Sequence, residues 1–206
     1  GQEYTVRGIL MDKETGEPLL VGGETVTAEV TFRAPAETGS VPMAFTFDSS
    51  AMKGKAVVVF ETLYLEEKEI AIHADIEDEG QTVTFLDPKI GTSAAGPDGE
   101  KVLGLCSEVT LVDTVSYENL IPGASYTLKG VLMDKGTGMP LLVDGKQEVA
   151  ETTFTPDAAS GTVEVVFTFP SAGLKGKTVV VFETLVAGDV EIATHADIED
   201  EGQTVT

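Results

Sequence analysis

HADIEDEGQTVT occupies residues 73–84 and recurs unchanged at residues 195–206. The identity extends well beyond this string. When residues 1–84 are laid over residues 123–206 at a constant offset of 122, 51 of 84 positions are identical and no gap is needed. This period exceeds the roughly 20 to 50 residues of solenoid repeats, so each copy should be a domain with its own core.

The repeat predicts two domains that differ in completeness. We expect one domain at residues 1–87 and a second at residues 88–206. The segment that precedes Tyr126 has no counterpart before Tyr4, so roughly 30 residues of the unit are missing from the first copy. The connecting string TFLDPKIG, residues 84–91, is short and contains a proline, which favours domains joined end to end with restricted swing.

Composition fits globular domains and argues against two classes of partner. The hydrophobic fraction of 42% is high enough for both copies to bury a core. Thirteen basic and 35 acidic residues give a formal net charge of −22, which repels nucleic acid and anionic membranes. No stretch approaches the length of a membrane span, which needs about 18 consecutive apolar residues. Cys106 is the single cysteine, so neither domain can hold an internal disulfide.

Apolar and polar residues alternate with a period of two along nearly every segment, and Gly, Pro, Asp and Ser interrupt the runs. This pattern predicts an all-β fold, and the number of runs suits a sandwich. The turn strings that begin at Asp12 and Asp134 supply the Gly and Pro of hairpins. The strands expected in the complete domain are Ile90–Ala94, Glu108–Tyr117, Ser125–Met133, Glu148–Phe154, Gly161–Phe169, Lys177–Leu185, Glu191–Ala196 and Gln203 onward.

Three of these strands place one reactive side chain in an otherwise apolar row. Asp113 lies in such a row of EVTLVDTVSY, Glu183 in that of VVVFETL, and Thr92 in that of KIGTSA. An ionised carboxylate in a core normally protonates or finds a partner, so Asp113 and Glu183 suggest each other as a pair that shares a proton. An edge position, or a face shifted by a bulge, is the alternative that spacing leaves open.

The chain has two histidines, His73 and His195, eight residues before Gln81 and Gln203 respectively. This repetition suggests proton transfer, and a structural histidine with a backbone partner is the alternative. The acidic string DIEDEG lacks the spacing of a calcium loop, so we interpret it as an acidic turn and predict no metal site.

The strings VVVFETL, LVDTVSYENLIPG, YTLKGVLMDK and HADIEDEGQTV together resemble the VaFE repeat, a Thr-Gln ester-forming domain. The resemblance covers nearly the whole chain. It implies tandem immunoglobulin-like (CnaB-like) β-sandwich domains in the stalk of a Gram-positive surface adhesin. It also implies an extracellular, cell-wall-anchored protein whose signal and anchor lie outside this sequence. Its expected partners are neighbouring repeats of the stalk, while the host ligand stays open and no cofactor is implied.

In that family a threonine near the first strand attacks the side-chain amide of a glutamine near the last, releasing ammonia and leaving an internal ester. Carried onto this chain, the resemblance makes Thr92 the nucleophile and Gln203 the acyl donor. His195 becomes the residue that transfers the proton, and Asp113 and Glu183 become the supporting acids. The domain would be its own substrate and close once, so no enzyme with an external substrate is implied.

The first copy departs from this pattern. It keeps Glu61, His73 and Gln81 but has no match for Thr92 or Asp113, so it cannot close its own ester. Either this copy is truncated, which is the interpretation that we prefer, or a donor strand from another chain supplies the hydroxyl. We expect an intact Gln81 amide unless such a strand is present.

Several alternatives remain. Ser93 is a second candidate nucleophile, although a period of two points it to the opposite face from Thr92. A Lys-Asn isopeptide would depend on Asn119, the only asparagine, and a Lys-Asp version stays open. A ligand-binding adhesin domain without a cross-link is the main alternative function, and a hydrolase is the third. The aromatic fraction of 6% and the short loops favour neither.

Overall fold

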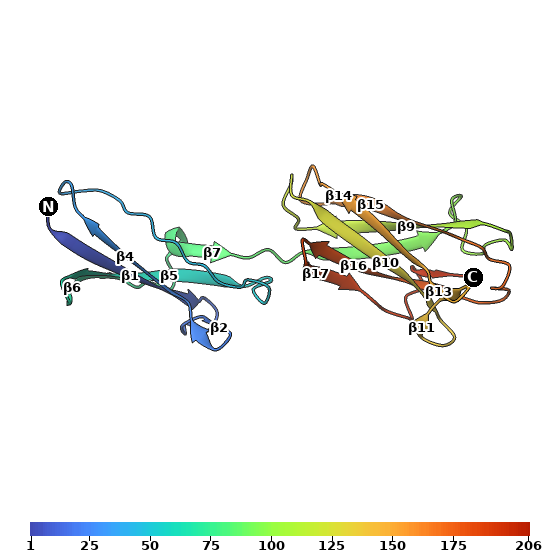
Figure 1. The fold of residues 1–206 in the computed structure, drawn as a ribbon, viewed down its shortest axis with the longest axis horizontal. Helices are drawn as coiled ribbons and strands as arrows, with labels where there is room; N and C mark the ends of the chain where they lie inside the picture. The colour runs from blue at the N-terminus through green and yellow to red at the C-terminus, as the bar shows by residue number, and fades with distance from the viewer. The chain divides into compact units, whose positions relative to one another are not determined.

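The computed structural model describes all 206 residues and divides the chain into two compact units, Gly1–Leu86 and Asp87–Thr206. Both units are built from β-strands (Figure 1), and the only helical element is a single 3-10 turn at Glu79–Gln81. The predicted all-β class is therefore confirmed. None of the helical structure could span a lipid bilayer.

The second unit consists of two main antiparallel sheets and a small separate hairpin (Figure 1). The first sheet has the order β14 (Val149–Phe154), β10 (Tyr126–Asp134), β16 (Val179–Ala187) and β17 (Val190–His195). Two short strands extend it, β11 (Met139–Pro140) on β10 and β18 (Thr204–Val205) on β16. The second sheet has the order β15 (Gly161–Phe169), β9 (Val109–Glu118) and β8 (Lys89–Ala95).

The alternation of the sequence decides which residues enter the core of the second unit. On β9 every second residue is buried, and the row contains Leu111, Asp113 and Val115. On β15 the buried row ends with Phe167 and Phe169. These rows join those of β10 and β16 in one continuous apolar cluster. Each fully buried aliphatic or aromatic side chain contributes about 1.5 to 3 kcal/mol to such a core.

Every strand expected in the second unit is present, with ends shifted by at most two residues. The alternation of the sequence did not predict β11 or the hairpin of β12 (Leu142–Val143) and β13 (Lys146–Gln147). Strands of two residues are too short to show an alternation. The turn before them is as expected, because Gly138 has a φ of 67° and the Asp134 side chain accepts a hydrogen bond from the Gly136 N–H.

The first unit has a single main sheet, with a small separate hairpin of β2 (Leu20–Val21) and β3 (Glu24–Thr25). The sheet order is β4 (Thr27–Arg33), β1 (Glu3–Asp12), β5 (Ala56–Leu65) and β6 (Lys68–His73), with β7 (Thr82–Thr84) on β5. Residues 39–47 align with β15 but belong to no strand. In the second unit β15 pairs with β9, and nothing in the first unit aligns with β9, so this segment has no strand to pair with.

A glycine on the central strand of each unit makes room for a phenylalanine ring. A Cβ added at Gly130 would lie 2.6 Å from Cζ of Phe167, and one added at Gly8 would lie 2.6 Å from Cζ of Phe45. Phe45 and Phe167 are equivalent in the repeat. The ring therefore keeps its place on the sheet even where the strand that carries it in the second unit is not formed.

The substitution Gly130→Ala should lower the free energy of unfolding by about 1 to 3 kcal/mol, because the added methyl overpacks the core against Phe167. Urea unfolding followed by circular dichroism would measure the change. Gly173→Ala is the control, since its Cβ would meet nothing within 4 Å. Equal losses for Gly130→Ala and Gly173→Ala would contradict this account.

Candidate functional site

The candidate site residues of the second unit come from five separate segments. Thr92 lies on β8, Asp113 on β9, Glu183 on β16, His195 at the end of β17, and Gln203 directly before β18. Strand β8 is an edge of one sheet, and it approaches β16, β17 and β18 of the other. The site therefore lies where the edges of the two sheets meet.

Hydrogen bonds hold the segment of Thr92 against the segment of Gln203. The Ala94 N–H donates to the Gly202 carbonyl over 3.0 Å. The Lys101 ammonium donates to the same Gly202 carbonyl over 2.6 Å and also to the Ala94 carbonyl. The residue two positions after Thr92 and the residue before Gln203 are thus joined directly and through Lys101.

The loop after β8 also binds the end of the chain. The Thr206 N–H donates to the Lys101 carbonyl over 2.8 Å, and the Leu103 N–H donates to the Thr206 carbonyl over 2.7 Å. These bonds hold the segment containing Gln203 from both ends, because Gly202 is bound before it and Thr206 after it.

The reactive side chains are sealed from solvent. Asp113 and Gln203 are 0% exposed, and Glu183 is 1% exposed. The Gln203 side-chain amide Nε2 donates to Asp113 Oδ1 over 3.3 Å. The Thr92 hydroxyl oxygen is also buried, whereas Ser93 is exposed. The alternation of β8 therefore presents Thr92, and not Ser93, to this interior.

All buried side-chain oxygens and nitrogens of the chain that lack a hydrogen-bond partner belong to this site. They are Thr92 Oγ1, Asp113 Oδ2, both carboxyl oxygens of Glu183 and Gln203 Oε1. Each buried unsatisfied polar group costs about 1 to 3 kcal/mol, and native cores contain few of them. Such a concentration of unpartnered atoms needs an explanation, and a chemical role of these groups is one that fits them.

Protonation of Glu183 lowers part of the cost of burying these unpartnered polar atoms. Burial, and after it the neighbouring carboxyl of Asp113, raises the pKa of Glu183 from 4.5 to about 10, while the Thr92 side chain acts in the opposite direction. Glu183 therefore carries a proton at neutral pH. Two ionised carboxylates can only accept hydrogen bonds, so this proton is what lets Glu183 and Asp113 be neighbours.

His195 lies beside this carboxyl pair. Glu183 and His195 are cross-strand partners on β16 and β17, so their side chains share one face of the sheet. His195 Nε2 is 2.7 Å from Asp200 Oδ2, and Asp200 Oδ1 accepts the Gly202 N–H over 2.7 Å. Burial acts to raise the pKa of Asp200, but the hydrogen bonds from His195 and the main chain hold this pKa below its usual value.

The sequence did not predict two residues that hold the site together, Asp200 and Lys101. The sequence places Asp200 only in an acidic turn, and DIEDEG does form that turn. The repeat could have indicated a histidine–aspartate pair, because His73 and Asp78 have the same spacing as His195 and Asp200. The repeat gives no indication of a role for Lys101, since this residue lies in a loop that has no counterpart in the first copy.

The first unit keeps part of the site in an uncovered form. Glu61 pairs with His73 across β5 and β6, and His73 Nε2 is 2.7 Å from Asp78 Oδ2. Glu61 and Gln81 are only half-buried, unlike their counterparts in the second unit. The sheet of β8 and β9, which supplies the hydroxyl and the second acid in the second unit, has no equivalent here.

The isopeptide alternatives find no support in the geometry. Asn119 is exposed and its side chain donates to the Asp87 carbonyl. One close lysine–aspartate contact joins Lys177 Nζ to Asp134 Oδ2 over 2.6 Å. The hydrogen bond from Lys177 lowers the pKa of Asp134 despite its burial, so the pair is a salt bridge and not a pair poised to form an amide.

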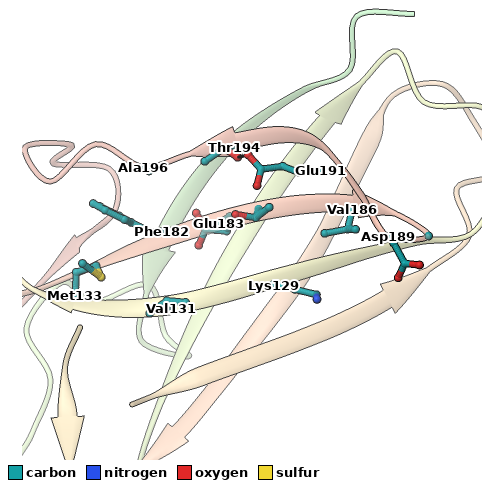
Figure 2. Close-up of a pocket in the computed structure, with 12 residues that line it drawn as sticks. Lys129, Val131, Met133, Phe182, Glu183, Val186, Asp189, Glu191, Thr194 and Ala196 are labelled. Atoms are coloured by element: carbon teal, nitrogen blue, oxygen red, sulfur yellow. Dashed lines mark hydrogen bonds between the residues drawn. The ribbon is translucent and has the colours of Figure 1, made fainter. Parts of the chain in front are cut away.

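A groove of about 560 Å³ lies on the outer face of β10, β16 and β17 (Figure 2). Three consecutive residues of β16, Phe182, Glu183 and Thr184, line it. Side chains alternate along a strand and Glu183 is only 1% exposed, so its carboxyl points into the core and away from the groove that Phe182 and Thr184 face. The groove and the buried site therefore occupy opposite faces of one sheet.

The Glu183 proton should make stability depend on pH. In a Thr92→Ala chain, which lacks the reactive hydroxyl, folded Glu183 keeps a proton that the unfolded chain releases above pH 4.5. Its contribution is complete below that pH and is lost as the pH rises toward about 10, with a limiting slope of about 1.4 kcal/mol per pH unit. Urea unfolding from about pH 5 to about pH 9 should show this decline, and adding Glu183→Gln should flatten it. Parallel curves for the two chains would contradict the assignment.

Comparison with known proteins agrees with this geometry. The family model of the T-Q ester bond containing domain matches residues 1–85 and 88–206, and no curated protein matches the sequence. Two crystal forms of a bacterial adhesin from Mobiluncus mulieris, which contains intramolecular disulfide, isopeptide and ester bond cross-links, share the fold. In both, the identity is 19% and the TM-score 0.50, over 58% of this chain and 56% of that chain. The chain thus spans little more than half of that adhesin's length.

The resemblance to Thr-Gln ester-forming domains is confirmed by the family match, which covers both copies of the repeat and nearly every residue. The chain therefore belongs to the family of T-Q ester bond containing domains.

Proposed function

We propose that Thr92 and Gln203 form an intramolecular ester that cross-links the first and last strands of the second unit. The observation that carries this proposal is the sealed set of side chains around them. A buried hydroxyl, a buried amide and a pair of buried carboxyls meet at one place, and they hold every unpartnered buried side-chain polar atom of the chain. These are the groups that an acyl transfer between two side chains requires.

The reaction would exchange one bond for another. Thr92 Oγ1 attacks the side-chain carbonyl carbon of Gln203, the new C–O bond forms, and the bond from that carbon to Nε2 breaks. The hydroxyl proton leaves with the nitrogen as ammonia. An unactivated hydroxyl is a poor nucleophile, so a base must accept its proton, and His195 is the base that we assign. His195 then returns the proton to the departing nitrogen.

The carboxyl pair would orient and polarise the amide. Asp113 already accepts a hydrogen bond from Gln203 Nε2, whereas the carbonyl oxygen Oε1 of Gln203 is buried without a donor. A protonated Glu183 supplies the donor that this oxygen needs as negative charge develops on it during attack. Donors placed in advance around such an oxygen are among the largest contributions to acyl-transfer catalysis.

The site fits a reaction of the domain with itself. A hydrolase acting on an external substrate needs an open cleft at its acids, and here Asp113 and Glu183 are sealed inside the sandwich. Folding alone brings Thr92 and Gln203 together and supplies the proximity that a bound substrate would otherwise provide. The closure is then autocatalytic, occurs once per chain and uses no cofactor.

The first unit keeps Glu61, His73 and Gln81, and none of residues 1–86 aligns with Thr92 or Asp113. An ester at Gln81 would therefore need a segment from outside these residues that carries both groups. A strand from another chain is one such partner.

The ester would serve a mechanical role. We assign the chain to the stalk of a bacterial surface adhesin, as tandem immunoglobulin-like domains joined end to end with neighbouring repeats, outside the cell and anchored to its wall. Membership of the ester-domain family and the shared fold of the Mobiluncus adhesin support this assignment. The cross-link spans 111 residues, which would otherwise extend by about 350 to 400 Å under load. It would also resist proteolysis, because local opening of the domain is restricted.

The mass of the intact chain tests the cross-link. We expect the purified protein to weigh less than its sequence by one ammonia, about 17 Da, the leaving group of amide-to-ester transfer. Thr92→Ala should restore the full mass, and Ser93→Ala, its exposed neighbour, should not. A loss of two ammonias would mean that the first unit also closes. A full mass for the unaltered protein would favour the alternative, a ligand-binding adhesin domain without an internal cross-link.

The cross-link should also stabilise the second unit against unfolding. Closing a loop of this length restricts the unfolded chain by about 4 to 5 kcal/mol in the chain-entropy model. Thr92→Ala should therefore lower the midpoint of thermal unfolding of the second unit, and Ser93→Ala should leave it near that of the unaltered protein. Calorimetry would separate the two units, and an unchanged second transition in Thr92→Ala would exclude a stabilising ester.

A further inference from the structure

Asp200 has no role in the reaction described above, although it touches both His195 and the turn that presents Gln203. Its Oδ2 lies 2.7 Å from His195 Nε2, and its Oδ1 accepts the Gly202 N–H over 2.7 Å. Its main-chain carbonyl accepts the Thr204 hydroxyl over 2.6 Å. One residue thus joins the assigned base to the residues on both sides of Gln203.

The contact with Asp200 decides which nitrogen of His195 can act as a base. Burial acts to raise the pKa of Asp200, yet the hydrogen bonds from His195 and from main-chain N–H groups keep that pKa below its usual value. Asp200 is therefore ionised at neutral pH and can only accept hydrogen bonds. Nε2 must then carry a hydrogen, and in a neutral imidazole the other nitrogen, Nδ1, is left with the free lone pair.

We propose that Asp200 is a positioning residue for ester closure, which holds His195 as the Nε2–H tautomer with Nδ1 free to accept the Thr92 proton. This inference rests on the proposed function, because it supplies the partner of the base in that reaction. The proton passes from Thr92 Oγ1 to His195 Nδ1 and then to Nε2 of Gln203 as ammonia departs. Asp200 accepts from His195 throughout and never takes the proton.

The position of His195 makes such a partner necessary. Its side chain is 25% exposed, so it lies at the rim of the site, where packing alone does not fix the orientation of the ring. Between the two proton transfers the ring is a cation, and an ionised carboxylate at 2.7 Å stabilises it through a charge-assisted hydrogen bond.

The first unit contains the same pair without a threonine to activate. His73 Nε2 lies 2.7 Å from Asp78 Oδ2, and Asp78 Oδ1 accepts the Gly80 N–H over 2.7 Å. The pair therefore forms from the local turn, with or without the covering sheet. It offers a matched control within the same chain.

The test is Asp200→Asn in the full chain. An asparagine keeps an oxygen that can accept the Gly202 N–H, so the turn is retained, and it turns its NH₂ toward His195, which favours the Nδ1–H tautomer. Chains made in a cell-free system would be sampled over time for the loss of ammonia by intact mass. We expect closure to slow by about 10²- to 10⁴-fold, the usual contribution of a general base. Asp78→Asn makes the same change in the first unit and should leave the rate unchanged.

The tautomer itself is measurable in an uncrosslinked chain. The protein contains only two histidines, so their imidazole ¹⁵N signals overlap little and each can be assigned. In Thr92→Ala, His195 should be the Nε2–H tautomer. Adding Asp200→Asn should convert it to Nδ1–H while His73 is unchanged.

Three results would overturn the proposal: closure of Asp200→Asn at the unaltered rate, slow closure with no change of tautomer, or a His195 that is Nδ1–H in the Thr92→Ala chain. If Asp200→Asn did not fold, the spectrum of Thr92→Ala would decide alone. An unaltered chain that never lost ammonia would instead refute the proposed function, whatever the tautomer of His195.

Discussion

A protonated glutamic acid buried against an aspartate is the constraint on which the second unit depends. Glu183 and Asp113 lie on different sheets, and both are sealed from solvent. Two charged carboxylates could not share such a place, so the sandwich can close only with a proton between them. The same closure brings the Thr92 hydroxyl and the Gln203 amide into an interior where water does not compete for them. In the reaction that we propose, the exclusion of water from these groups is what makes the transfer possible.

Comparison of the two units shows which features of the site form from nearby residues and which depend on packing between distant strands. The turn HADIEDEG forms the same histidine–aspartate contact in both units, because its hydrogen bonds lie within a few residues. Burial of the neighbouring glutamine differs, since it depends on the sheet of β8 and β9. The segment that aligns with β15 shows the same dependence. It alternates as a strand should, yet forms none without a neighbour to pair with.

The sequence predicted the strands and their inward faces well, because alternation with a period of two records burial directly. It also singled out Thr92, Asp113 and Glu183 as polar residues in apolar rows, and the structure buries the reactive atoms of all three. Lys101 could not be predicted, because it binds main-chain carbonyls, which leave no trace in residue identity. Asp200 was one of several acids in DIEDEG, and only the folded turn distinguishes the one that faces His195.

By itself, the sequence determined that the chain is a repeat of β-rich units, which face of each strand is buried, and that the histidine, glutamate and glutamine of the candidate site recur in both copies. Those properties follow from the order of residues along a strand. Only the tertiary structure decided that Thr92, Asp113, Glu183 and Gln203 meet, and that Glu183 keeps its proton. These depend on how strands distant in the chain pair and pack, and on the loss of solvent around charged groups, which no local pattern of residues encodes.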